Sequence, residues 1–199
     1  MLTNTRRFAV LVLLGTCAAA GTAPAQTTAI APAGPVREGF WIGVGLGVGN
    51  AGVECAQCSS NQRYGAPTFT LRMGGTPTRH VLVGGELNGW GRETLGVTET
   101  LGDLSAVIVW YPSERSTFYV KGGLGVVVYQ LDTSPKVETE GMGLNAGVGI
   151  DIYLSRNFSL TPYASVVASG GGPVKIGGTD TGYEARPNLV LVGIAATWH

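Results

Sequence analysis

From Glu38 to the carboxyl terminus, apolar residues alternate with polar residues or glycine at a period of two. Successive side chains of a β-strand point to opposite faces, so this period predicts strands and argues against helices. Eight stretches show the pattern, each near or above the roughly 9–11 residues with which a tilted strand crosses a bilayer. We expect strands at about 38–49, 66–75, 80–91, 99–111, 117–130, 140–153, 158–169 and 184–198.

The connections between these stretches alternate in length. Three are tight turns: TPTR (76–79), PSERS (112–116) and SRN (155–157). The others are longer and polar or glycine-rich, at 50–65, 92–98, 131–139 and 170–183. Short turns on one side and long loops on the other are typical of an outer-membrane barrel with both termini in the periplasm.

The two faces of the predicted strands differ in character. In 140–153 one face is apolar, with Met142, Leu144, Ala146, Val148, Ile150 and Ile152. The other face carries Gly143, Asn145, Gly147, Gly149, Asp151 and Tyr153. An apolar outside and a polar or glycine inside suit a barrel wall in lipid, whereas a soluble barrel inverts the pattern. The sequence therefore predicts an all-β fold, an eight-stranded antiparallel up-and-down transmembrane β-barrel.

Aromatic residues gather at the strand ends that carry the short turns. Trp and Tyr are enriched where a membrane meets water, so we expect a periplasmic girdle. The alternative is that aromatic residues simply favour strands, but clustering at one set of ends favours the girdle. Its predicted members are Trp41, Trp110, Phe118, Tyr153, Phe158 and Trp198.

The chain begins MLTNTRRFAVLVLLGTCAAAGTAPAQ, with a basic start, an apolar run and an Ala23-Pro24-Ala25 pattern. These features predict a secretory signal peptide at 1–25, then a flexible leader at 26–37 and the barrel at 38–199. Lipoprotein processing at Cys17 is the alternative. Cleavage after Ala25 leaves 11 basic and 13 acidic residues, because Arg6 and Arg7 are removed. This balance offers no basic face for nucleic acid.

Five charged residues fall on the predicted inner face: Arg72, Glu86, Asp103, Lys121 and Asp151. Eight strands leave an interior that side chains just fill, which is too narrow for a wide diffusion pore. Buried charges need partners. We therefore expect Lys121 to pair with Asp151 and Arg72 with Glu86, in an ion network that plugs the barrel. The alternative is a proton or ion path.

Other candidate chemistry is weak. The glycines of GVGLGVGN (43–50) alternate within one strand, whereas a dinucleotide site needs them at a strand-to-helix turn. His80 and His199 both map to the short-turn side, and we expect no serine within reach of either as a nucleophile. We therefore expect no enzyme, no cofactor and no metal site, because the further metal ligands do not assemble.

VECAQCSSN (53–61) places Cys55 and Cys58 in a CxxC spacing. This spacing suits a redox centre, half of a zinc site or a local disulfide. A redox centre needs a helix amino terminus to lower the thiol pKa, and zinc needs a second pair of ligands. The predicted loop passes through an oxidising compartment, so we expect a Cys55–Cys58 disulfide that shapes a surface loop.

Several fragments are similar to known barrels: YVKGGLGVVVY (119–129), LNAGVGIDIYL (144–154), SLTPYASV (159–166) and LVLVGIAATWH (189–199). With these, residues 38–199 resemble small outer-membrane barrels of the OmpA/OmpX type. The resemblance implies a Gram-negative outer membrane, contact with its lipids and lipopolysaccharide, insertion by the barrel-assembly machinery, and a monomer. It departs at the carboxyl terminus, where His199 follows the aromatic Trp198.

Such barrels serve many functions, so the resemblance alone assigns none. The expected role is structural, or one of surface interaction in which the outer loops contact an unidentified extracellular ligand. One alternative is a narrow channel, or a portal for small solutes or hydrophobic compounds. Two others are an enzyme that modifies lipid A and a soluble secreted calycin-like binder.

Overall fold

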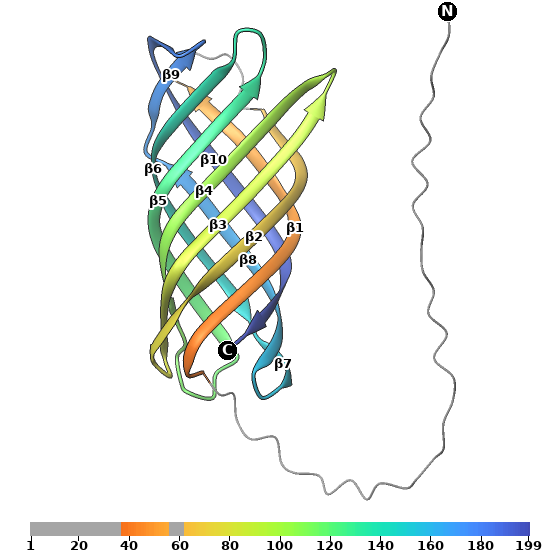
Figure 1. Cartoon of the computed structure of the whole chain (residues 1–199), viewed down its shortest axis with the longest axis vertical. Helices are drawn as coiled ribbons and strands as arrows, with labels where there is room; N and C mark the ends of the chain where they lie inside the picture. The colour runs from red at the N-terminus through yellow and green to blue at the C-terminus, as the bar shows by residue number, and fades with distance from the viewer. Residues whose placement is uncertain (1–36, 56–61) are drawn as a thin grey trace, which may run out of the picture. The chain divides into compact units, whose positions relative to one another are not determined.

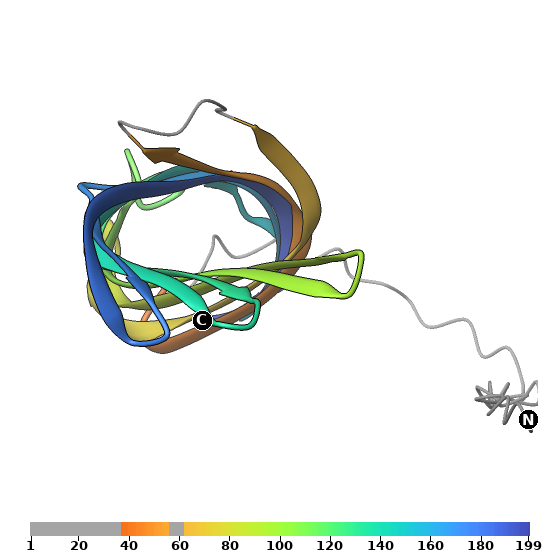
Figure 2. The same ribbon diagram turned by 90° about the horizontal axis from the view of Figure 1, so that it is seen from above.

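A computed structural model describes residues 37–55 and 62–199, and these form one closed antiparallel β-barrel (Figures 1 and 2). The ring closes where the first strand pairs with the last, from Ile42 opposite Trp198 to Cys55 opposite Ala185. The strands are β1 (Gly39–Cys55), β2 (Arg63–Thr78), β3 (Val81–Thr94), β4 (Val97–Trp110), β5 (Phe118–Asp132), β6 (Val137–Ile150), β7 (Ile152–Ser155), β8 (Phe158–Ser169), β9 (Gly172–Ile176) and β10 (Thr179–Trp198).

Two of these strands are continuations, so the wall is eight strands wide. β7 continues β6 beyond Asp151, and both pair with β8. β9 continues β8 beyond Gly170 and Gly171, and like β8 it lies between β6 and β10. The predicted eight-stranded antiparallel barrel is confirmed.

The barrel has two unlike ends. The turn end holds the connections at 79–80, 111–117 and 156–157, together with the carboxyl terminus, as Figure 1 shows near β7. The hairpin end holds the connections between β3 and β4, β5 and β6, and β9 and β10. Residues 56–61, between β1 and β2, lie outside the described part of the chain.

Strand extends into all four of the predicted long loops, so within the described residues these connections are shorter than predicted. β3 and β4 pair as far as Thr94 and Val97, and only Leu95 and Gly96 turn between them, both at positive φ. Such a turn matches the twist of a hairpin. Residues 172–176 and 179–183 are likewise strand. Polar residues at these positions indicate contact with water, but water on the side chains does not prevent the backbones of two strands from pairing.

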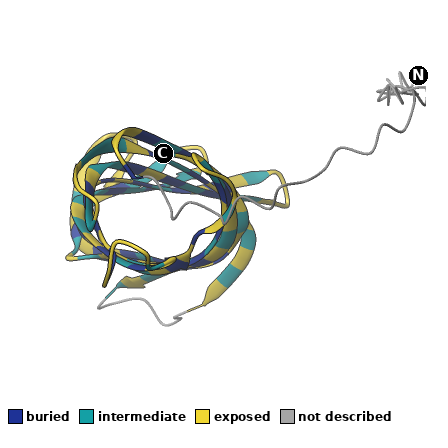
Figure 3. Cartoon of the chain, turned by 90° about the horizontal axis from the view of Figure 1, so that it is seen from below, coloured by how far each residue is buried: buried dark blue, intermediate teal, exposed yellow. Residues whose placement is uncertain are grey.

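Burial alternates along each strand, as Figure 3 shows around the ring. On β1, Leu46 is 70% exposed and faces outward, whereas Trp41 is 1% exposed and faces the interior. The outward face keeps apolar residues exposed on every wall strand, including Leu104 on β4 and Ile194 on β10. A contiguous apolar surface this large is unfavourable in water and suits a surrounding of lipid. Among residues 37–55 and 62–199, no helix is long and apolar enough to cross a membrane.

Two adjacent glycines of β3 give a test of how closely the strands pack. A Cβ atom on Gly84, which lies opposite Gly74, would be 2.0 Å from the carbonyl oxygen of Met73, whereas one on Gly85 meets nothing within 4 Å. We expect Gly84→Ala to lower the free energy of unfolding by about 2 kcal/mol, since an overpacked backbone must shift. Gly85→Ala, the matched control, should change it little. Urea unfolding in lipid vesicles measures both, and equal effects would contradict the close approach.

Candidate functional site

Side chains fill the interior in three layers, which can be followed along β4. Its inward residues pass from Val109 at the turn end through Ser105 and Asp103 to Leu101 and Glu99 at the hairpin end. The turn layer is aromatic and contains Trp41, Leu82, Val109, Tyr111 and Tyr119. The middle layer is polar and contains Glu86, Asn88, Asp103, Ser105, Lys121 and Asn145. The apolar layer contains Ala51, Trp90, Leu101, Val127, Tyr129, Tyr163, Val167, Leu189, Leu191 and Ala195.

Glu86 and Lys121 form the centre of the middle layer. Lys121 Nζ donates hydrogen bonds to both carboxylate oxygens of Glu86, at 2.5 Å to Oε2, and the two side chains are 1% and 0% exposed. Asn145 Nδ2 donates at 3.0 Å to Glu86 Oε1 and at 3.0 Å to Asp103 Oδ2. Asn88 donates to the same two carboxylates, at 2.8 and 3.0 Å. One buried cation thus faces two carboxylates that are also held by amide donors.

All five predicted interior charges are buried, but the predicted pairs are wrong. Lys121 pairs with Glu86 instead of Asp151. Arg72 instead donates to Tyr119 Oη at 2.5 Å and to Thr197 Oγ1 at 3.1 Å. The prediction paired neighbouring strands, whereas β4 lies between Glu86 on β3 and Lys121 on β5. In so narrow a barrel, long side chains reach across the interior.

Asp151 belongs to the turn end, where it accepts hydrogen bonds from Tyr111 and Thr161, each at 2.7 Å. Arg37 covers this group and is 1% exposed. Its guanidinium lies 3.5 Å from the centroid of the Tyr111 ring and donates to the carbonyl oxygens of Glu114 and Ser116. Arg37, assigned to the flexible leader in the sequence, is therefore a fixed cap over the turn end.

Ser159, His199 and Asp151 approach one another at the turn end without forming a catalytic triad. His199 Nε2 lies 3.4 Å from Ser159 Oγ and 3.8 Å from Asp151 Oδ2. A triad needs the acid on the other ring nitrogen, so that one nitrogen can take the proton of serine. Burial lowers the pKa of His199 to about 4, so the ring is neutral near pH 7. Ser159 itself is fully buried, and a substrate would not reach it.

The other histidine, His80, lies in an exposed turn. Its Nδ1 is 3.3 Å from the carbonyl oxygen of Tyr111, and its Nε2 is 3.9 Å from Glu114. Within the described residues, no group of three or more His, Cys, Asp and Glu side chains is arranged to hold a metal ion.

The aromatic residues of the predicted girdle divide between the two faces. Trp110, Phe118 and Trp198 are exposed on the outward face, and the ring of Phe158 lies 4.9 Å from that of Trp198. Membership is wrong for Trp41, which points inward and donates Nε1–H to the Gly75 carbonyl oxygen at 3.2 Å. Tyr153 is also not a member of the girdle, because its hydroxyl oxygen accepts a hydrogen bond from Arg37 Nε at 3.1 Å.

Cys55 is the last residue of β1, at the hairpin end, and Cys58 lies outside the described residues. The Cys55–Cys58 disulfide stays a prediction.

The hairpin end opens into a cavity of about 370 Å³, which we call the cup. Val53, Tyr64, Tyr129 and Leu131 line it and also belong to the apolar layer or pack against it, so that layer closes its inner end. The apolar layer differs from the polar or glycine-lined interior that the alternation along the strands predicts. A signal existed in VVVY (126–129) and LVLV (189–192), where residues on both faces are apolar.

A polar group is built into the wall of the cup. Glu99 is 7% exposed. It accepts a hydrogen bond from Tyr129 Oη and forms an ion pair with Arg92. The Arg92 guanidinium also stacks 3.3 Å from the centroid of the Tyr64 ring. These four residues come from four consecutive strands, β2 to β5, so the group links one side of the mouth.

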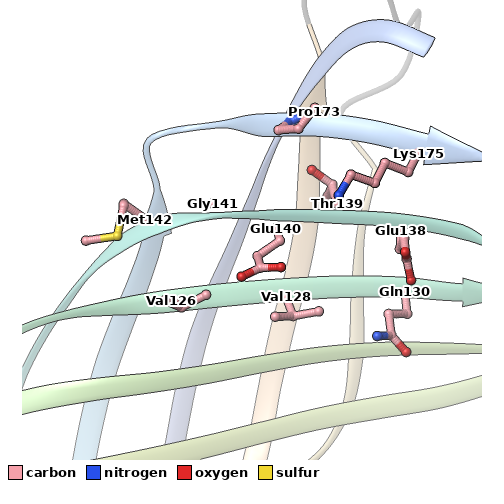
Figure 4. Close-up of a pocket in the computed structure, with 10 residues that line it drawn as sticks. All are labelled: Val126, Val128, Gln130, Glu138, Thr139, Glu140, Gly141, Met142, Pro173 and Lys175. Carbon is pink, nitrogen blue, oxygen red and sulfur yellow. The ribbon is translucent and has the colours of Figure 1, made fainter. Parts of the chain in front are cut away.

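A second hollow, of about 350 Å³, lies on the outward face across β5, β6 and β9 (Figure 4). Val126, Val128 and Met142 form its apolar part, and Glu140 and Lys175 belong to its polar part. We call it the outer hollow. Thr139 and Glu138 of β6 line both this hollow and the cup.

The fold is that of the small eight-stranded outer-membrane β-barrels. Neisserial surface protein A superposes with a TM-score of 0.53 and 12% identity, over 78% of this chain and 95% of that one. Ail, the attachment invasion locus protein of Yersinia pestis, solved with the heparin analogue sucrose octasulfate, gives 0.50 and 12%, over 80% and 99%. No protein-family model matches this chain, and no curated protein matches its sequence.

Because Glu86 and Lys121 are paired and buried, we expect replacement of either one alone to cause a large loss of stability. We expect Lys121→Met to lower the free energy of unfolding by about 4 kcal/mol, because it leaves a carboxylate buried without its cation. The double variant Glu86→Gln with Lys121→Met should recover part of that loss. The exposed ion pair of Arg79 with Glu38, at 2.6 Å, is the control, and Arg79→Met should change stability little. Additive losses in the double variant, measured by urea unfolding, would contradict the pairing.

Proposed function

We propose that this chain is an integral outer-membrane protein whose interior is closed to solutes and whose hairpin end faces the outside of the cell. The observation that carries this proposal is the filled interior. Three successive layers, aromatic, polar and apolar, occupy the interior between the two ends. The role that such a body supports is structural or one of surface interaction, made by the parts that project beyond the lipid.

The outward face supports placement in a membrane. On β1 the apolar outward residues run from Phe40 to Val48, nine positions, which matches the roughly 9–11 residues of a membrane-crossing strand. β1 and β10 continue well beyond Val48 and Val190 toward the hairpin end. Short turns face the periplasm in barrels of this kind, so the turn end and the carboxyl terminus belong on that side.

The middle layer opposes passage of ions. A permeating ion would have to separate Lys121 from Glu86 or lose its own hydration beside them, and both cost several kcal/mol. At the hairpin end the apolar layer offers an ion no partner. The narrow channel, or a portal running along the barrel axis, is therefore the weaker candidate.

The remaining parts of the proposal follow from the same placement. The signal peptide would direct the chain to the periplasm, the barrel-assembly machinery would insert it, and outer-membrane lipids and lipopolysaccharide would surround it. Because lipid would cover the apolar outward face, the protein would not need a second copy of itself to bury that face, and it would be a monomer. Catalysis has no part in the proposal, and the extracellular ligand is unidentified.

Planar-bilayer recording tests the closed interior. Purified protein, inserted and shown to be folded by its heat-modifiable mobility in gels, should give no discrete conductance steps in molar salt. The physical reason is the continuous packing from Tyr111 to Leu189. Discrete steps from the folded protein would contradict the proposal, and a change in their size in a folded Lys121→Ala variant would place the ion path through the middle layer.

A further inference from the structure

The cup is a cavity at the hairpin end, and a barrel whose interior is closed to solutes has no need of it. We propose that it binds a small, uncharged, mainly apolar molecule that carries one hydrogen-bond donor, such as a hydroxyl group. This goes beyond a structural role and does not depend on which end faces outside.

The size and shape of the cup suit a small ligand. Its volume of about 370 Å³ lies in the range of roughly 300–1,000 Å³ that is usual for such sites. The inner end is closed, because Tyr129, which lines the cup, packs in the same buried cluster as Trp90 and Leu101. A molecule that enters is therefore held at the hairpin end and does not pass along the axis.

The walls set the apolar character of the ligand. Six strands contribute apolar or aromatic side chains to these walls: Val53, Tyr64, Leu131, Val137, Val174 and Ala185. Contact with these walls favours an apolar ligand, because burial of apolar surface is favourable and such a ligand gives up few hydrogen bonds to water on entry.

The charges around the cup are balanced, which disfavours a charged ligand. Glu99 is paired with Arg92, and Glu138 at the rim lies 3.5 Å from Lys136. A charged ligand would give up its water without meeting an unmatched opposite charge. The cup therefore selects neutral molecules.

The polar group on the wall selects a donor. Glu99 accepts one hydrogen bond from Tyr129 at Oε1 and one from Arg92 at Oε2. A carboxylate has about four acceptor positions, so two remain. The hydroxyl hydrogen of Tyr129 is engaged by Glu99, which leaves its oxygen as an acceptor as well. The Glu99 carboxylate and the Tyr129 oxygen, which both line the cup, can therefore accept a hydrogen bond, and a ligand hydroxyl supplies the donor.

This acceptor pair is fixed before a ligand arrives. Arg92 is held between the Glu99 carboxylate and the Tyr64 ring, so Glu99 cannot turn away. Groups that are already ordered lose less entropy on binding.

The outer hollow does not share these features. It opens on the outward face, where Val126, Val128 and Met142 continue the apolar band that lipid would cover (Figure 4). It serves as the matched control for the cup.

Trp90 provides a probe near the cup, since it packs in the same buried cluster as Tyr129, which lines the cup. It is 3% exposed and donates Nε1–H to the Gly49 carbonyl oxygen at 3.1 Å. The experiment uses the mature chain in lipid nanodiscs and the quencher 4-bromobenzyl alcohol. The difference in fluorescence between the native chain and Trp90→Phe isolates Trp90 from the other three tryptophans. We expect this difference to be quenched saturably by the alcohol.

Substitutions separate the cup from the lipid. Val174→Phe and Val137→Phe both narrow the cup and should each weaken the quenching of Trp90 at least tenfold. Met142→Phe enlarges a side chain in the outer hollow and should leave it unchanged. Each variant must show heat-modifiable mobility, and two cup variants are used so that one that fails to fold does not decide the result. Quenching that does not saturate, or that is equal in cup and control variants, overturns the proposal.

The donor is tested with 4-bromobenzyl methyl ether, which has the same ring and bromine but no hydroxyl hydrogen. We expect the ether to bind about tenfold more weakly than the alcohol, as the loss of one hydrogen bond implies. That difference should shrink in Tyr129→Phe. Equal binding of the alcohol and the ether overturns the assignment of the donor. Bilayer conductance is a separate readout, so failure of the closed interior and failure of this site are distinguishable.

Discussion

Pairing of every backbone N–H and C=O group is the constraint on which this structure depends. In hydrocarbon an unpaired backbone group costs several kcal/mol, so a sheet can lie in lipid only when it has no edge. The register between β1 and β10, fourteen residue pairs from Ile42–Trp198 to Cys55–Ala185, removes the edge that either strand would otherwise expose. The outward face can then be apolar along its length, because no backbone group there needs water.

Closure with eight strands determines the interior. The space inside such a ring is about as wide as the side chains that enter it, so each large residue needs a small one beside it. Trp41 lies opposite Gly74, and the Tyr119 ring lies where a Cβ on Gly149 would be, 2.4 Å away. The same narrowness brings Lys121 to Glu86 across an intervening strand. Glycines on the inner face are therefore the counterpart of the aromatic and charged side chains that fill the barrel.

Much of the fold could be predicted from the sequence, because a period of two shows which residues of a strand share the same face of the sheet. Alternation in 140–153 and the short turns at 76–79 and 155–157 were enough to give the strand number, the closure and the inward side of Arg72, Glu86, Asp103, Lys121 and Asp151. What they could not give is contact across the interior, since alternation describes one strand at a time. The Glu86–Lys121 pair, the Arg37 cap and the stacking of Arg92 on the Tyr64 ring all join residues that neither lie near in sequence nor face each other in register. The extended hairpins could not be predicted for another reason. Polar side chains indicate contact with solvent and say little about whether the backbones of two strands pair.

The central claim is that the interior is closed to water-borne molecules, and thiol labelling at Ser105 tests it most directly. Ser105 lies in the middle layer, 2% exposed, and donates to Asp103 Oδ1 at 2.6 Å. In a chain with Cys55 and Cys58 replaced by serine, Ser105→Cys would be treated with a cationic methanethiosulfonate reagent, beside Ser113→Cys in an exposed turn. The account predicts that the folded protein reacts at position 113 and not at 105, and that both react after unfolding in urea. Labelling at 105 in the folded barrel, at a rate close to that at 113, would contradict it.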